Sequence, residues 1–329
     1  MLNMKKALLL FWMGLTSLSG WAQDDVTRYY LTNYGFDSDF DYTASQRVAV
    51  AQEIREIPGW TANLSADYTV TGVYEFGFGG TFNGTSVPAT GADGEAGGAL
   101  ALSTGWEQTF CYTQTVTLPA GTYTFSAATY NAKGVTGGTS LLAWIPNSGT
   151  SVTSTLKSYP SRTWKEDKIT FTLTRSTVGK LQIGYKAAAG GSANSANLLI
   201  DYVKLTGENM AVSKTTLNTS INAANRQYGD GTGKGAAEFK AVIDAAQAVY
   251  DKEEATMPEV LEANYNVKEA TETYKLKNAT EAKPVDLTSR ITNPSFETNG
   301  TAGWTVSGMG TQSNRSSEAR AGPTIWKPG

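Results

Sequence analysis

The stretch Cys111–Ala132 reads CYTQTVTLPAGTYTFSAATYNA and indicates the fold class of the chain. Polar and apolar residues alternate in TQTVTL and again in TYTFSAATY, and this period of two is typical of strands with one buried face. Pro119, Ala120 and Gly121 lie between the two runs and predict a turn, after which the second strand returns antiparallel to the first. The segment DKITFTLTRSTVGKLQIGYKA (167–187) repeats this arrangement.

The same character extends over residues 28–207, which are rich in Gly, Thr, Ser and Tyr and end in the apolar run ANLLIDYVKLTG (196–207). Short alternating runs joined by turn residues predict an all-β region. Strand-rich sequence over about 180 residues, with connections of varied length, favours a two-sheet sandwich of jelly-roll type.

Residues 213–280 change to a helical pattern. In EFKAVIDAAQAVYD (238–251) the apolar residues recur every three or four positions and form one face. TMPE (256–259) is a capping box, with Thr256 as the cap and Glu259 three residues later. Three amphipathic helices with short loops predict an up-down-up bundle, which we interpret as a spacer because each helix has only a narrow apolar stripe.

A short motif occurs twice. LTNYGFD (31–37) is followed by GWT at residues 59–61, and ITNPSFE (291–297) is followed by GWT at residues 303–305. Self-similarity of this kind indicates a repeated unit. Residues 288–329 therefore predict the start of a second, incomplete jelly-roll domain, and the chain is expected to be a fragment of a longer protein that holds a catalytic or anchoring domain. The predicted fold is mainly β with an α segment: a jelly-roll β-sandwich, a three-helix bundle and an incomplete second β-domain.

The first 22 residues predict a secretory signal peptide, with a basic start, an apolar core and small residues before a cut after Ala22. Trp21 stands where a bacterial lipoprotein would have its cysteine, so we expect a secreted protein and not a lipoprotein. No other segment is long and apolar enough to predict a membrane span. Removing residues 1–22 leaves 25 basic and 30 acidic residues without a basic run, which argues against nucleic acid as a partner.

Histidine is absent from the chain, so histidine-dependent triads, zinc ligands and general bases are excluded. The chain has one cysteine, Cys111, and therefore no internal disulfide. Because Cys111 lies within a predicted strand, a packed thiol is favoured over a nucleophile.

Several features carry a resemblance to known families: the Asn-x-x-Phe-acid opening with its Gly-Trp, the LPAGTY turn and the terminal LLIDYVKL. On these features residues 31–207 resemble the galactose-binding-like jelly rolls that serve as carbohydrate-binding modules in secreted bacterial glycan-degrading proteins. Residues 213–280 are similar to the three-helix FIVAR modules of bacterial surface proteins, although Asn266-Val267 stands where that family usually has a leucine.

The jelly-roll resemblance implies a structural calcium ion, held by the acid after the opening Phe and by the acid of the last strand. Those positions are Asp37 and Asp201, with Glu297 as the counterpart of Asp37 in the second copy. A carboxylate between Ile200 and Tyr202 in an apolar strand needs a partner. The alternative is that Asp201 is solvated or hydrogen-bonds the backbone.

Aromatic residues near turns are the candidates for sugar binding, because sugar sites combine an aromatic platform with hydrogen-bonding side chains. Trp60 and Trp304 belong to the repeated motif and are expected in the core. Trp106, Trp144, Tyr130 and Asn131 lie beside predicted turns or strand ends and are the predicted carbohydrate-binding residues. The alternative for each aromatic is a packed core position, because large aromatic side chains are mostly buried.

Taken together, these features predict non-catalytic polysaccharide binding by an exported protein. Two alternatives stay open. One is a structural or adhesive surface protein in which the domains are spacers. The other is a glycoside hydrolase or lyase acting through two carboxylates, for which no convincing pair of acids is found.

Overall fold

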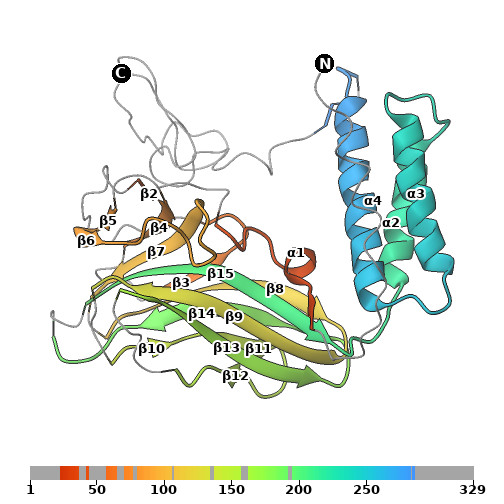
Figure 1. Ribbon diagram of the computed structural model, residues 1–329. Coiled ribbons are helices and arrows are strands. Elements are labelled where there is room, and N and C mark those ends of the chain that lie inside the picture. Colours follow the sequence, from red (N-terminus) through yellow and green to blue (C-terminus); the bar gives the residue numbers. More distant parts are fainter. Residues whose placement is uncertain are drawn as a thin grey trace, which may run out of the picture.

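The computed structural model describes residues 23–36, 42–43, 57–64, 70–76, 80–105, 107–133, 137–156, 162–191, 195–282 and 284–285. These residues form a β-sandwich followed by three packed helices (Figure 1). The predicted second β-domain, residues 288–329, and the predicted signal peptide, residues 1–22, lie outside the described part of the chain. No helix in the described ranges is both long and apolar enough to cross a membrane.

Within the described residues, the first sheet has seven strands. Six follow the order β13-β9-β15-β7-β4-β2, and β1 pairs with the C-terminal end of β15. All neighbours are antiparallel except β2 and β4. The strands are β1 (Asp24–Asp25), β2 (Tyr42–Thr43), β4 (Val70–Glu75), β7 (Gly98–Thr104), β9 (Gly121–Asn131), β13 (Trp164–Leu173) and β15 (Ala196–Glu208).

The described part of the second sheet has six strands in the order β12-β11-β14-β8-β3, with β10 pairing β14. A separate hairpin, β5 and β6, packs on the outer face of the first sheet through Phe82. The strands are β3 (Thr61–Leu64), β5 (Thr81–Phe82), β6 (Thr85–Ser86), β8 (Thr109–Leu118), β10 (Thr139–Ser140), β11 (Ala143–Pro146), β12 (Val152–Thr153) and β14 (Thr177–Lys186).

The two alternating runs around Pro119 form the predicted strands, β8 and β9, but these do not pair with each other. β8 pairs with β14 and β3 in one sheet, and β9 pairs with β13 and β15 in the other. The sequence does not show that the second strand lies in the other sheet: the turn crosses between the sheets. Pro119 has no amide hydrogen to donate to a hairpin ladder, and its carbonyl accepts a hydrogen bond from Tyr123 Oη at 3.0 Å. β13 and β14 are divided between the sheets in the same way.

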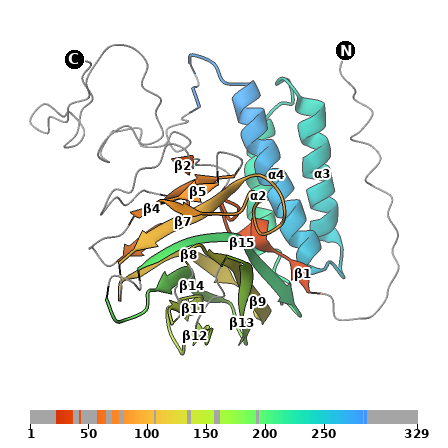
Figure 2. The same ribbon diagram turned by 60° about the vertical axis from the view of Figure 1, so that its left-hand side comes forward.

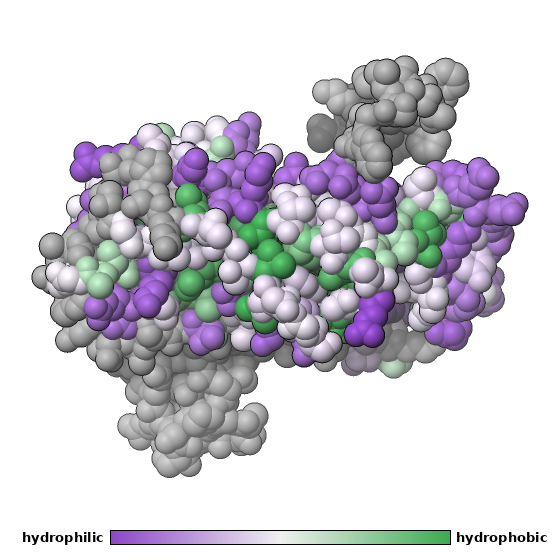
Figure 3. Space-filling model, turned by 90° about the horizontal axis from the view of Figure 1, so that it is seen from below, coloured by the Kyte–Doolittle hydropathy of each residue, from purple (hydrophilic) through white to green (hydrophobic). Residues whose placement is uncertain are grey.

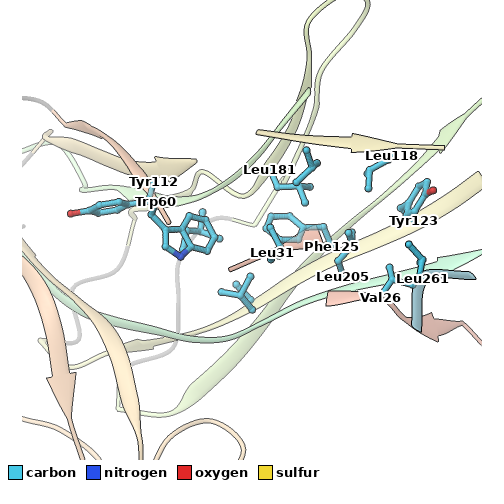
Figure 4. Packing of buried hydrophobic residues seen from close by; sticks show 14 of the residues in the cluster. Val26, Leu31, Trp60, Tyr112, Leu118, Tyr123, Phe125, Leu181, Leu205 and Leu261 are labelled. Carbon is cyan, nitrogen blue, oxygen red and sulfur yellow. The ribbon is translucent and has the colours of Figure 1, made fainter. Parts of the chain in front are cut away.

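The core lies between the sheets and is filled by the alternate side chains of their facing strands. Leu181 from the second sheet faces Phe125 and Leu205 from the first (Figure 4). Trp144 of β11 stacks on Phe171 of β13 with ring centroids 4.9 Å apart and planes at 1°. The indole fits because residue 179 is glycine: a Cβ there would lie 2.5 Å from Trp144 Cη2.

The predicted three-helix arrangement is observed in residues 213–280. The helices pack on one another through one apolar face each, and Leu217, Ile243 and Val267 are buried. The capping box of the last helix is confirmed: Thr256 Oγ1 accepts from Glu259 N, and the Glu259 carboxylate accepts from Thr256 N. The helices are α1 (Thr27–Tyr30) in the sandwich, then α2 (Thr215–Tyr228), α3 (Ala236–Asp251) and α4 (Met257–Lys277) in the bundle.

Replacement of Trp144 tests whether its ring is part of the core. Trp144→Ala is expected to lower the free energy of unfolding by about 3–5 kcal/mol, because it removes a buried aromatic side chain and leaves a cavity. Chemical denaturation followed by circular dichroism measures the loss. Val178→Ala, at a side chain that is 40% exposed, is the control and is expected to cost less than about 0.5 kcal/mol. Equal stability of both variants would contradict the core assignment.

Candidate functional site

A cavity of about 510 Å³ opens beside the bulged middle of β15, where the side chain of Lys204 points away from the sandwich core. Its walls come from α1, from the loop that follows α1, from the glycine-rich loop before β7 and from β15. Cavities of this size hold small ligands or one end of a larger one. The elements that form it are far apart in the sequence and meet around the middle of the first sheet.

A bulge in β15 shapes one wall of the cavity. Asp201 lies opposite Ala128 of β9, whereas the next registered pair is Lys204 with Ser126, so two residues of β15 face one residue of its neighbour. A bulge of this kind re-aims side chains. Tyr202 adopts φ 53° and is 45% exposed, although a regular strand would have turned it toward the core. The bulge therefore presents an aromatic ring at the cavity.

Asp201 anchors the opposite wall. The residue is only 6% exposed, and its carboxylate accepts hydrogen bonds from the backbone amides of Ala92 at 2.8 Å and Tyr202 at 2.6 Å. The loop can approach this closely because residue 91 is glycine: a Cβ there would lie 2.5 Å from Asp201 Oδ2. Glu95 N then bonds Asp93 Oδ1 at 3.0 Å. Asp201 thus links β15 to the loop that carries two of the cavity's carboxylates.

The charged groups of the cavity are mainly acidic. Asp25, Asp93, Glu95 and Asp201 line it, against two cations, Arg28 and Lys204. Both cations have anionic partners, because Lys204 Nζ lies 3.5 Å from Asp25 Oδ2 and Arg28 pairs with Glu262 of α4. Burial acts to raise the pKa of Asp25, but hydrogen bonds from Thr27 and the charge of Lys204 outweigh it and hold this pKa below its usual value.

Two tyrosines supply exposed aromatic surface to the cavity. Tyr34, 38% exposed, comes from the loop after α1, and Tyr202 comes from the bulge. Tyr29 also lines the cavity, and burial together with its hydrogen bond to Glu262 raises the pKa of its hydroxyl. Aromatic faces beside carboxylates can pack on the apolar C–H face of a sugar and accept hydrogen bonds from its hydroxyls.

The predicted carbohydrate-binding residues do not come together at this cavity. Tyr130 is 7% exposed and packs on Trp164 with ring centroids 5.5 Å apart. Asn131 is 1% exposed and lies opposite Leu198, on the core side of the sheet. Trp144 is 2% exposed, so the structure corrects these three assignments: buried side chains have no face to offer a sugar. Trp106 lies outside the described residues, and its role stays a prediction.

A second cavity, of about 410 Å³, lies at the edge of the sandwich between β12 and β13. Figure 3 shows the molecule from the side on which these two strands lie in Figure 1, with hydrophobic residues reaching the surface between polar ones. Trp144 borders this cavity, but its ring is enclosed by Phe171 and the backbone of residue 179. Half of the residues in its walls carry hydroxyl side chains, among them Ser148 and Thr150.

Of the two predicted calcium ligands, Asp201 lies in the cavity wall, and Asp37 is outside the described residues. In the part of the chain that the structure describes, no group of three or more aspartate, glutamate or cysteine side chains is placed to hold a metal ion. The backbone hydrogen bonds of Asp201 match the alternative reading of this residue.

Cys111 is buried, and burial raises the pKa of its thiol. Its Sγ donates to the carbonyl oxygen of Asn63 at 3.3 Å. A thiol with a raised pKa is a poor nucleophile at neutral pH, which agrees with the reading of Cys111 as a packed residue.

Sequence reasoning missed Tyr34 and Tyr202. Tyr34 lies inside the LTNYGFD motif, which indicates the fold but does not indicate a binding role for its tyrosine. Tyr202 reads as one more apolar position of a regular strand, since it is two residues after the buried Ile200. The one available signal was Asp201, a carboxylate in the middle of an apolar run, because an acid there marks an irregular strand.

Comparison with known proteins found no family model and no curated protein that matches the chain. Solved structures do match. A carbohydrate-binding module, TmCBM61, in complex with β-1,4-galactotriose is 16% identical over 54% of this chain and 98% of its own, with a TM-score of 0.36. The CBM22-1 xylan-binding domain of Xyn10C from Paenibacillus barcinonensis is 10% identical over 49% of this chain and 93% of its own, with a TM-score of 0.32. At these values the site has to be interpreted from its own geometry.

Removing the Asp201 carboxylate tests its anchoring role. Asp201→Ala leaves the amides of Ala92 and Tyr202 without this acceptor and is expected to lower the free energy of unfolding by about 1–3 kcal/mol. Urea denaturation measures the loss. Glu95→Ala, at an exposed side chain of the same loop, is the control and is expected to change stability by less than about 0.5 kcal/mol. An Asp201→Ala variant as stable as the control would show that the loop does not depend on this residue.

Proposed function

We propose that this chain is a non-catalytic glycan-binding protein and that the cavity between α1 and the bulge of β15 holds the sugar. The observation that carries the proposal is the pair of exposed rings, Tyr34 and Tyr202, in one cavity with carboxylates that accept hydrogen bonds. Sugars are bound by such combinations of aromatic surface and fixed polar groups. The predicted signal peptide, residues 1–22, supports export, which would bring the site into contact with extracellular polysaccharide.

The charge of the cavity favours a neutral glycan. Asp201 is left out of this balance, because the calcium ion proposed below would neutralise it together with Asp37. Among the other described residues that line the cavity, three carboxylates face two cations, and both cations already have anionic partners. A uronic acid or a sulfated sugar would bring a further negative charge into the cavity. Repulsion between like charges would make its binding free energy less favourable. Neutral polysaccharides are therefore the proposed ligands.

Affinity electrophoresis through gels that contain soluble polysaccharide tests both parts of the proposal. β-1,4-Galactan and xylan serve as neutral probes, and polygalacturonate serves as the acidic probe. The wild type is expected to be retarded by a neutral glycan and not by polygalacturonate. Tyr34→Ala and Tyr202→Asn are each expected to weaken retention about tenfold, because each removes an aromatic contact. Asparagine is chosen at position 202 because it tolerates the positive φ there.

Two variants serve as controls for this experiment. Tyr202→Phe keeps the ring, and Thr117→Ala changes an exposed residue of β8 in the opposite sheet; both are expected to bind like the wild type. Retention that survives both Tyr34→Ala and Tyr202→Asn would place the sugar elsewhere. Failure of the wild type to bind any glycan would favour the structural or adhesive alternative, and product formation from the probes would favour the enzyme.

Calcium is the second part of the proposal, with Asp37 and Asp201 as the ligands. The support is the position of Asp201, a buried carboxylate against a loop whose backbone approaches it closely. An ion bound only by the folded state raises its stability. Excess chelator is therefore expected to lower the melting temperature of the wild type at neutral pH, and added calcium is expected to restore it. The chelator is expected to have no effect on Asp201→Ala. An unchanged melting curve of the wild type would falsify the calcium site.

A further inference from the structure

The helical bundle lies beside the sandwich (Figure 2), and α4 contacts α1. Residues of α1 also line the candidate cavity. Val26, just before α1, is fully buried and belongs to the same hydrophobic cluster as Leu261 of α4, and the two side chains lie next to each other (Figure 4). The core of the bundle is therefore continuous with the core of the sandwich. A spacer that only separates two domains would have no shared core of this kind.

A second set of contacts joins α1 to α4 at the same place. The rings of Tyr29 and Tyr265 meet edge to face, with centroids 6.0 Å apart and planes at 72°. The guanidinium of Arg28 lies 5.0 Å from the centroid of the Tyr29 ring and 5.4 Å from that of Tyr265. Glu262 accepts hydrogen bonds from both Arg28 Nη2 and Tyr29 Oη. The carboxylate of Glu262 on α4 thus holds the side chains of Arg28 and Tyr29 on α1.

The connection between the two parts is also fixed. Ala211 N donates to the carbonyl oxygen of Ala120 at 2.7 Å, so the linker is tied to the turn between the sheets. Lys214 Nζ donates to the carbonyl oxygen of Tyr250 at 2.9 Å, so the start of the bundle is tied to the end of α3. These two contacts fix the start of the bundle relative to the sandwich.

Arg28 and Tyr29 are also walls of the cavity. The position of these two side chains therefore depends on Glu262 of the bundle. The same residue decides whether the charge of Arg28 is available to a ligand. With Glu262 in place, the cation of Arg28 is neutralised by an ion pair; without it, the cavity would gain a positive charge with no anionic partner on α4. The bundle thus affects both the shape and the charge of the cavity.

We infer that α4 is part of the glycan-binding unit and that Glu262 is a positioning residue that keeps the cavity selective for neutral glycans. The inference rests on the proposed function. Glu262 does not line the cavity; it acts through Arg28 and Tyr29, which do. Its loss is expected to change which glycans bind, because Arg28 would then be free to pair with the carboxylate of an acidic sugar.

The test uses the full chain with Glu262→Gln. Isothermal titration with a neutral oligosaccharide is expected to show affinity about fivefold or more below that of the wild type, the usual lower range for coupling between sites. Titration with oligogalacturonate is expected to show binding that the wild type lacks. In the double variant Arg28→Gln/Glu262→Gln this gain is expected to disappear. A merely structural role of Glu262 would weaken binding of the neutral probe and would give no binding of oligogalacturonate.

Glu272→Gln is the matched control, because Glu272 is an exposed carboxylate of the same helix whose ion pair is with Lys275 of α4. It is expected to bind both probes like the wild type. If the wild type binds a neutral glycan and Glu262→Gln keeps the same affinities and selectivity, the inference is wrong and the proposed function stands. If the wild type binds no glycan in either assay, the proposed function fails and the inference fails with it.

Discussion

The bulge in β15 is the constraint on which the rest of the sandwich and its cavity depend. β15 lies inside the first sheet; it pairs with β9 along most of its length and with β7 from Ala196 to Ile200. One extra residue between Asp201 and Lys204 keeps Ile200 and Val203 in the core and turns Tyr202 outward. The same irregularity brings the Asp201 carboxylate under the loop at residues 91–95 and lets Lys204 meet Asp25. A regular strand would bury Tyr202 and leave the cavity without this wall.

Much of the fold could be predicted from the sequence because it depends on local patterns. Period-two runs predicted the strands, helical periodicity predicted the helices, and TMPE predicted a capping box that the structure contains. The division of β8 and β9 between two sheets could not be predicted, because the alternation of a strand shows that one face is buried but does not show which sheet holds the strand. A turn within one sheet and a turn between two sheets have the same sequence signal.

The site could not be predicted in the same way. Tyr130, Asn131 and Trp144 were chosen for their nearness to turn residues, but a strand end can lie inside the sandwich as easily as at its surface. Tyr202 was missed because its exposure depends on a bulge, and the period of two in a strand does not show where an extra residue is inserted. Nor did the narrow apolar stripes of the helices indicate that α4 packs on the sandwich, since that contact is made by Tyr265, Glu262 and Leu261 together.

The pairing of β1 with the far end of β15 has a consequence for the order of folding. Asp24 pairs with Gly207 and Asp25 pairs with Thr206, so the first described strand pairs with the last strand of the sandwich. Such long-range pairs form late, because the entropy of closing a long loop must be overcome before they contribute stability. The helices α2, α3 and α4 make mainly local contacts, which form faster. During synthesis, however, these helices emerge only after residue 208, so the part of the chain expected to fold faster leaves the ribosome after the sandwich.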